Sequence, residues 1–194
     1  SNYTYFMKKS ITTFLKHPTK DITNRSANPP IIRASTILFD SMQEMLQHEK
    51  KVKSHKNITH YTYGRYGSTT TIQLENIIKK LEQAYHVFLT GTGFGGISLA
   101  LMSLCRPSDE ILVSDNVYGP TREISEDLLK EFNIKAKFYN PENFEDLKSK
   151  ISKKTKLILV ENPGSNTFEF QDLSRIVKLA KSKNILTLLD NTWG

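Results

Sequence analysis

A run of aliphatic residues that gives way abruptly to polar ones occupies positions 157–166, with the sequence LILVENPGSN. Four consecutive apolar residues without alternation are typical of a β-strand that is buried on both faces, as in a parallel sheet covered by helices. The Pro-Gly pair that follows ends such a strand. Because ligands bind beyond the carboxyl ends of the strands in open parallel sheets, the polar residues after position 160 are candidates for a binding site.

The same strand-then-helix pattern repeats from about residue 87 onward. Short apolar runs predict further strands at 87–89, 111–113, 135–139 and 185–189, and helical spacing lies between them at about 96–104, 119–132, 143–152 and 172–183. Strands separated by helices require crossover connections. The sequence therefore predicts an α/β fold with a mostly parallel sheet flanked by helices.

The residues before this pattern have a different composition. They are polar and rich in Thr and Ser, they contain Pro29-Pro30, and they predict helices at 41–51 and 71–85. We expect an N-terminal arm and dimer-contact segment over 1–60 and a binding domain over 61–194. An arm that reaches a second subunit and an unattached terminus both fit this composition.

A glycine-rich loop with the sequence TGTGFGG follows the predicted strand at 87–89 and precedes a predicted helix. Glycines allow the backbone to approach an anion closely, and the start of a helix offers free N–H groups and the positive end of its dipole. The loop at 90–96 therefore predicts a phosphate site.

Other polar residues are expected at the same edge of the sheet. Tyr118 follows the strand at 111–113, an amide-rich segment follows position 160, and Asp190 follows the last strand. A phosphate loop, an aromatic ring, amides and a carboxylate together indicate a pocket for a phosphorylated cofactor that contains a ring.

Two cofactors compete for this pocket. Gly91, Gly93 and Gly96 have the spacing of the dinucleotide fingerprint, and Asp115 lies nineteen residues beyond Gly96, where a ribose-binding acid is expected. This alternative gives no role to Tyr118 or to the residues near position 63. Pyridoxal phosphate (PLP) is the second candidate.

Composition limits the other classes of function. The chain of 194 residues carries 27 Lys and Arg against 20 Asp and Glu, a net charge of +7, but the basic residues are mostly Lys and are spread over many segments, which argues against nucleic-acid binding. A lone Cys105 gives no internal disulfide, and the five His residues lack metal-binding spacing. We expect a soluble cytoplasmic protein without a metal or a membrane segment.

Several blocks of the sequence resemble the cystathionine β-lyase-like members of the Cys/Met-metabolism family of PLP enzymes, fold type I. The resemblance covers about five-sixths of the chain, in the family's order. Its blocks are 28–30 (NPP), 33–36 (RAST), 61–65 (YTYGR), 81–82 (LE), the glycine loop, 116–118 (NVY), 161–165 (ENPGS) and 189–193 (LDNTW).

The resemblance assigns a role to particular residues. Gly93 and Phe94 match the backbone N–H groups that bind the PLP phosphate, and Tyr118 matches the residue that stacks on the pyridine ring and has a possible acid/base role. Asp190 matches the carboxylate that faces the ring nitrogen, and Ser165 lies where relatives place a residue beside the ring hydroxyl. Tyr63 and Arg65 match a pair that reaches the phosphate from the neighbouring subunit, which implies a homo-oligomer, dimer or tetramer, with shared sites.

The resemblance also predicts what these 194 residues do not contain. In the family, the Schiff-base lysine lies shortly after the motif that matches 190–192, whereas the last lysine of this sequence is Lys183. We therefore expect a truncated N-terminal portion of a carbon–sulfur lyase that converts L-cystathionine, or a related sulfur amino acid, into homocysteine, pyruvate and ammonia. The portion is expected to be inactive by itself. A non-catalytic remnant that binds PLP or a partner subunit is the alternative.

Overall fold

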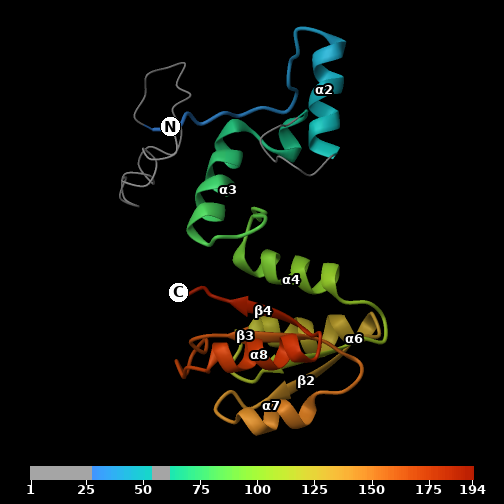
Figure 1. Ribbon diagram of the computed structural model, residues 1–194, viewed down its shortest axis with the longest axis vertical. Helices are drawn as coiled ribbons and strands as arrows, with labels where there is room; N and C mark the ends of the chain where they lie inside the picture. The colour runs from blue at the N-terminus through green and yellow to red at the C-terminus, as the bar shows by residue number, and fades with distance from the viewer. Residues whose placement is uncertain (1–27, 54–61) are drawn as a thin grey trace. The chain divides into compact units, whose positions relative to one another are not determined.

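The computed structural model describes residues 28–53 and 62–194, which divide into two compact units between Leu89 and Thr90 (Figure 1). The predicted arm over 1–60 falls largely outside the described residues. The expected boundary at 60/61 falls within the undescribed segment 54–61, so it stays a prediction.

The first unit contains α2 (Met42–Lys53), the short 3₁₀ helix η2 (Gly64–Tyr66) and α3 (Thr69–Leu81). Helix α3 begins with a capping box, in which the Ser68 hydroxyl accepts the Thr71 N–H and the Thr71 hydroxyl accepts the Ser68 N–H. An isolated antiparallel bridge joins Thr36 to Tyr63, so the extended segment before α2 is tied to the residues just before η2.

The second unit contains a four-stranded sheet that is parallel throughout, which confirms the predicted α/β class. Its strands are β1 (Glu110–Ser114), β2 (Lys135–Tyr139), β3 (Thr155–Glu161) and β4 (Leu186–Asp190), in the spatial order β2-β1-β3-β4. The two central strands, β1 and β3, carry the continuous aliphatic runs. Both strands are buried because each has a neighbouring strand on either side and helices over both faces.

Helices cover both faces of this sheet (Figure 1). Ile111 and Val113 of β1 face one core, which also contains residues of α4 and of the helical segment after β1. Leu112 faces the opposite core, against the helices that follow β2 and β3. The helices are α4 (Gly93–Leu104), α5 (Gly119–Glu123), α6 (Leu129–Glu131), α7 (Phe144–Lys150) and α8 (Leu173–Ser182), with the π-helical turn η3 (Ile124–Leu128) between α5 and α6.

The strand predicted at 87–89 is wrong. The segment is extended but belongs to no sheet, and its Phe88 is 76% exposed. A strand needs a partner ladder for its backbone N–H and C=O groups. Within the described residues this segment has no such partner, and an apolar run alone does not reveal that.

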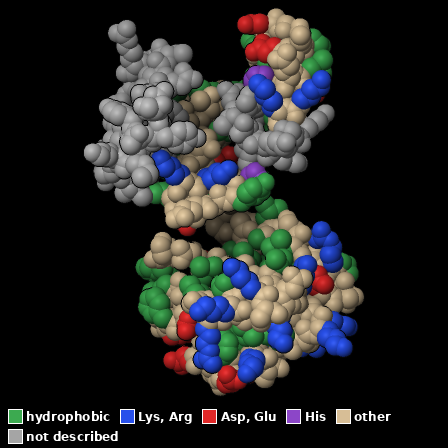
Figure 2. Space-filling model, viewed as in Figure 1, with side chains coloured by type: hydrophobic (Ala, Val, Ile, Leu, Met, Phe, Trp, Pro, Cys, Tyr) green, Lys and Arg blue, Asp and Glu red, His purple; other side chains and the backbone are tan. Residues whose placement is uncertain are grey.

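Charged side chains of the second unit are dispersed. On the face seen in Figure 2, Lys and Arg side chains lie among apolar and neutral atoms rather than in one stripe. Within 28–53 and 62–194, no helix is long and apolar enough to cross a membrane.

At the amino end of the sheet, a buried carboxylate pairs with a half-buried lysine. Glu110, at the start of β1, is 6% exposed, and its carboxylate lies 2.6 Å from the Lys137 ammonium and accepts hydrogen bonds from the hydroxyls of Ser152 (2.9 Å) and Thr155 (3.1 Å). Burial alone would raise the pKa of this carboxyl. Lys137 and the two hydroxyls outweigh burial and hold the pKa below its ordinary value.

Glu110→Gln should therefore lower the free energy of unfolding at neutral pH by roughly 1–3 kcal/mol, because the charge-assisted contact with Lys137 is lost. The pKa of Glu110 is lower in the folded than in the unfolded chain. Its contribution is thus fully present above the unfolded value of about 4.3 and is lost as the pH falls through the lower folded value. Urea unfolding followed by circular dichroism, at neutral and at acidic pH, measures both effects.

The exposed Glu145 provides the control, since its two ion pairs are long, at 3.4 and 3.5 Å. Glu145→Gln should change stability by less than about 0.5 kcal/mol. If Glu110→Gln kept the full pH dependence of the wild type on the acid side, the role given to Glu110 would be wrong.

Candidate functional site

Tyr118 stands between the end of β1 and the start of α5, where it is the N-cap residue of the helix. Its backbone C=O accepts the N–H groups of Thr121 (2.9 Å) and Arg122 (3.1 Å), and its own N–H donates to a carboxylate oxygen of Glu161 at 2.6 Å. The backbone of Tyr118 is thus held on both sides. Its side chain stays 46% exposed and is open to a ligand.

The segment after β3 lies beside this turn. The Ser165 N–H donates to the backbone C=O of Asn116 at 3.0 Å, which ties the residues after β3 to those after β1. Glu161, the last residue of β3, is 4% exposed. Burial raises the pKa of its carboxyl; the Tyr118 N–H acts against this, the charge of Asp190 adds to it, and a hydrogen bond from the Ser165 side chain also opposes it.

Asp190 ends β4 and is the register partner of Glu161 across the β3–β4 ladder. One of its carboxylate oxygens, Oδ1, accepts the N–H (3.1 Å) and the hydroxyl (2.6 Å) of Thr192. No hydrogen bond to the second oxygen, Oδ2, occurs within the described residues. Asp190 is half-buried.

A buried amide supports this edge of the sheet from below. The Gln171 side chain donates to the Ser114 hydroxyl at 2.9 Å and accepts the Tyr139 hydroxyl at 2.9 Å. Burial raises the pKa of Tyr139 far above its ordinary value, so Tyr139 stays a neutral donor. The sequence analysis missed Gln171, because nothing in its local pattern distinguishes it from a surface glutamine.

Asp115, the ribose-binding acid of the dinucleotide alternative, has another partner. Its carboxylate is paired with the Arg122 guanidinium, which also donates to the Asp115 backbone C=O at 2.9 Å and lies 4.1 Å from the centre of the Phe138 ring. The Asp115 carboxylate is therefore part of an ion pair within the turn after β1.

The glycine loop opens α4 as predicted. The Thr92 hydroxyl accepts the Gly95 N–H at 2.9 Å, and the Thr92 C=O accepts the Gly96 N–H at 3.1 Å. The first N–H groups of a helix have no partner within the helix, and those of Gly93 and Phe94 make no hydrogen bond to the residues that the structure describes. A Cβ atom added at Gly93 would have no atom within 4 Å, which leaves room for a ligand. Helix α4 packs against α5, the helix that Tyr118 caps.

Tyr63 and Arg65 belong to the first unit. The Arg65 guanidinium lies over the rings of Tyr63 and Tyr66, 5.4 and 5.3 Å from their centres, and the Tyr63 hydroxyl accepts that of Ser35 at 3.0 Å. The structure thus brings Tyr118, Ser165 and Asp190 together at one sheet edge of the second unit, and it gathers Tyr63 and Arg65 in the first.

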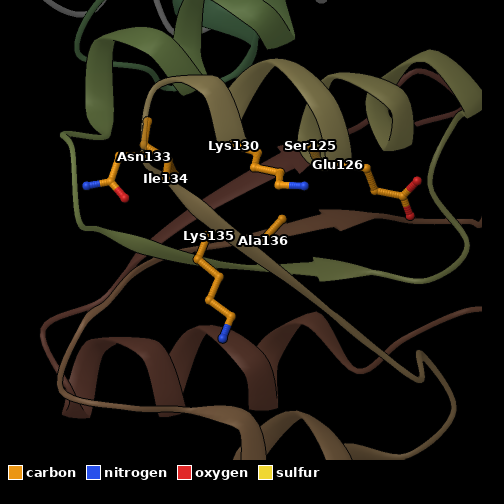
Figure 3. Close-up of a pocket in the computed structure, with 7 residues that line it drawn as sticks. All are labelled: Ser125, Glu126, Lys130, Asn133, Ile134, Lys135 and Ala136. Atoms are coloured by element: carbon orange, nitrogen blue, oxygen red, sulfur yellow. The ribbon is translucent and has the colours of Figure 1, made fainter.

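A cavity of about 370 Å³ in the second unit lies away from this edge. It is lined by η3, α6 and the amino end of β2, and Lys130 and Lys135 are among its exposed lining residues (Figure 3). Because the carboxyl ends of the strands lie at the other end of the sheet, this cavity is not part of the candidate site.

The fold of the chain is that of PLP-dependent enzymes. A cystathionine gamma-lyase structure from Lactobacillus plantarum, in complex with L-serine, is 26% identical, with a TM-score of 0.79 over 94% of this chain and 44% of that one. A Campylobacter jejuni structure that contains pyridoxyl-lysine phosphate is 22% identical, with a TM-score of 0.79 over 93% of this chain and 43% of that one.

The family follows from the sequence. A family model described as Cys/Met metabolism PLP-dependent enzyme matches residues 12–194, so the chain belongs to this family. A cystathionine beta-lyase of Bordetella avium is 34% identical over 191 residues, which are 96% of this chain and 47% of that protein. The chain thus spans about half the length of this relative. Membership in this family replaces the dinucleotide alternative.

The residues present fit PLP. The open N–H groups of Gly93 and Phe94 suit a phosphate, the exposed ring of Tyr118 suits a stacked pyridine, and the free oxygen of Asp190 suits a protonated ring nitrogen. Each group is of the chemical type that its proposed partner on PLP requires.

Gly164 generates a test of this edge. A Cβ atom at position 164 would overlap the Asn116 side chain, which accepts the Ser114 hydroxyl. Gly164→Ala should displace Asn116 and cost roughly 1–3 kcal/mol in the free energy of unfolding. Gly119→Ala is the matched control and should cost little, since a Cβ there has no atom within 4 Å. Equal losses in urea unfolding of the two variants would contradict the packing described here.

Proposed function

We propose that the chain is the cofactor-binding part of a PLP-dependent carbon–sulfur lyase that converts L-cystathionine into homocysteine, pyruvate and ammonia. One observation carries the proposal. Residues at or after the ends of three different strands, Tyr118, Ser165 and Asp190, meet at one sheet edge, and all three contact or neighbour Glu161. Family membership supplies the cofactor that suits these groups.

The residues of this chain are proposed to orient the pyridine ring of PLP and to polarise it. The side chain of Tyr118 would stack on the pyridine, and Ser165 would lie beside the ring hydroxyl. The Asp190 carboxylate keeps the ring nitrogen protonated, because a nearby negative charge favours the cation. When bound, PLP would supply an electron sink for the elimination.

At the phosphate, the chain offers two sets of donors. The N–H groups of Gly93 and Phe94 bind it within one subunit, at the positive end of α4. Tyr63 and Arg65 contact it from a neighbouring subunit, so the working protein is a homo-oligomer with shared sites. The planar guanidinium of Arg65 suits two phosphate oxygens at once, and its stacking on two tyrosine rings orients it.

The substrate is proposed from the relatives. The Bordetella avium relative is named a cystathionine beta-lyase, and the Lactobacillus plantarum structure is a cystathionine gamma-lyase. We propose β-elimination because the Bordetella avium relative carries the name of a beta-lyase. We also propose a cytoplasmic enzyme, consistent with a single, buried cysteine and hence no internal disulfide.

Residues 1–194 alone are expected to bind PLP reversibly, without turnover of L-cystathionine above that of free PLP. The resemblance implies that the lysine that carries PLP follows the motif at 190–192, and the last lysine of this sequence is Lys183. The second candidate function is retention of PLP by non-covalent contacts alone, without catalysis. The position of the last lysine favours it.

Fluorescence of Trp193 tests the cofactor site, because it is the only tryptophan of the chain, lies three residues after Asp190 and packs on Phe168 with 5.2 Å between ring centres. PLP should quench it saturably. Asp190→Asn keeps an acceptor for Thr192 but removes the charge, and it should weaken PLP binding by about tenfold to a hundredfold, as expected for loss of a charged hydrogen bond.

The exposed Asp127 supplies the control, and Asp127→Asn should bind PLP like the wild type. Arg65→Ala should also bind more weakly, and mixing it with Asp190→Asn should recover part of the lost affinity through one intact shared site. Quenching that is unsaturable, or equal in all variants, would refute the proposed site.

A further inference from the structure

Glu161 is the one buried carboxylate at the candidate site whose contacts are all internal. One of its oxygens accepts the Tyr118 backbone N–H at 2.6 Å, a charge-assisted bond that crosses from the end of β3 to the turn after β1. The residue is 4% exposed, so ligands do not reach it directly. Burial of a carboxylate is costly, and an apolar side chain would fill the position at lower cost.

The position of Glu161 joins the two residues that are proposed to contact the cofactor ring. Its backbone is paired with that of Asp190 in the β3–β4 ladder, and its side chain holds the backbone of Tyr118. Among the described residues, the other backbone hydrogen bonds of Tyr118 are those of its C=O, which accepts two N–H groups of α5. Without the Glu161 bond, the described hydrogen bonds of Tyr118 itself would run only to α5. The residues just before it, Asp115 and Asn116, would keep their backbone hydrogen bonds to Tyr139 and Ser165.

We infer that Glu161 is a positioning residue that holds Tyr118 in register with Asp190, so that the stacking ring and the carboxylate meet the same pyridine. The inference rests on the proposed function. Glu161 is not proposed to touch the cofactor or the substrate. It acts on the stacking ring through the Tyr118 backbone, and it also accepts a hydrogen bond from the Ser165 side chain. The length of the Glu161 side chain, which we call its reach, places an acceptor oxygen at hydrogen-bond distance from the Tyr118 N–H. This reach matters more to the proposed role than the negative charge does.

Two variants separate reach from charge. Glu161→Gln keeps an acceptor oxygen at the same distance and removes the charge. Glu161→Asp keeps the charge but is shorter by one methylene, so its oxygens fall short of the Tyr118 N–H. A positioning role predicts that Asp is the more harmful change, whereas an electrostatic role predicts that Gln is.

Glu110→Gln is the matched control. Glu110 is similarly buried, at 6% exposed, but lies at the opposite end of the sheet, where it pairs with Lys137. This variant should lower stability without changing how a ligand is oriented at the carboxyl edge. It distinguishes a positional effect at Tyr118 from a general loosening of the sheet.

The first measurement uses the chain without ligand. Amide hydrogen exchange and the proton chemical shift of the Tyr118 N–H report its hydrogen bond directly. Protection and a downfield shift are expected in the wild type and in Glu161→Gln, and both should be lost in Glu161→Asp. Loss in Glu161→Gln, or retention in Glu161→Asp, overturns the inference.

The second measurement adds PLP and records its visible circular dichroism per bound molecule, which reports the orientation of the ring. The signal should fall severalfold in Glu161→Asp and stay close to the wild-type value in Glu161→Gln and Glu110→Gln. Equal signals in all variants, or a larger loss in Glu161→Gln, overturn the inference and leave the proposed function standing. A wild-type chain that binds no PLP overturns the proposed function and the inference with it.

Discussion

The parallel direction of all four strands is the constraint on which the site depends. Because β1, β3 and β4 run in the same direction, their last residues lie at one edge of the sheet, and the segments that follow lie side by side. These last residues are Ser114, Glu161 and Asp190. Antiparallel pairing would send one of these turns to the opposite edge. The crossover helices that parallel pairing requires then bury both faces and fix the strands against each other.

The two edges of the sheet use buried carboxylates for different purposes. At the amino edge, Glu110 is neutralised by Lys137 and two hydroxyls, an arrangement that contributes to stability. At the carboxyl edge, no cation of the described residues pairs with Glu161, which bonds to a backbone N–H. The environment of Glu161 raises the pKa of its carboxyl, whereas the environment of Glu110 lowers the pKa of that carboxyl. A carboxylate kept at that energetic cost is consistent with a role in holding a ligand site.

Much of the fold follows from the sequence because aliphatic runs and helical spacing are local signals, and β1 to β4 lie where those runs predict them. The segment 87–89 failed, since pairing depends on a partner strand that an apolar run does not specify. The positions of Tyr118, Ser165 and Asp190 at strand ends were predictable from the parallel sheet. The Glu161–Tyr118 bond and Gln171 were not, because contacts over 43 and 57 residues depend on how the strands are ordered. Glu161 did leave a signal, an acid at the end of an apolar run.

A map of amide chemical shifts on addition of PLP tests most directly whether the carboxyl edge of the sheet is the cofactor site. The account predicts shifts at Gly93, Phe94, Tyr118 and Ser165, in one saturable process, with no change around the cavity near Lys130 and Lys135. Shifts that cluster at these exposed lysines, or that spread over many lysines without saturation, would indicate indiscriminate reaction of PLP with surface amines. That result would contradict a site built at the ends of β1, β3 and β4.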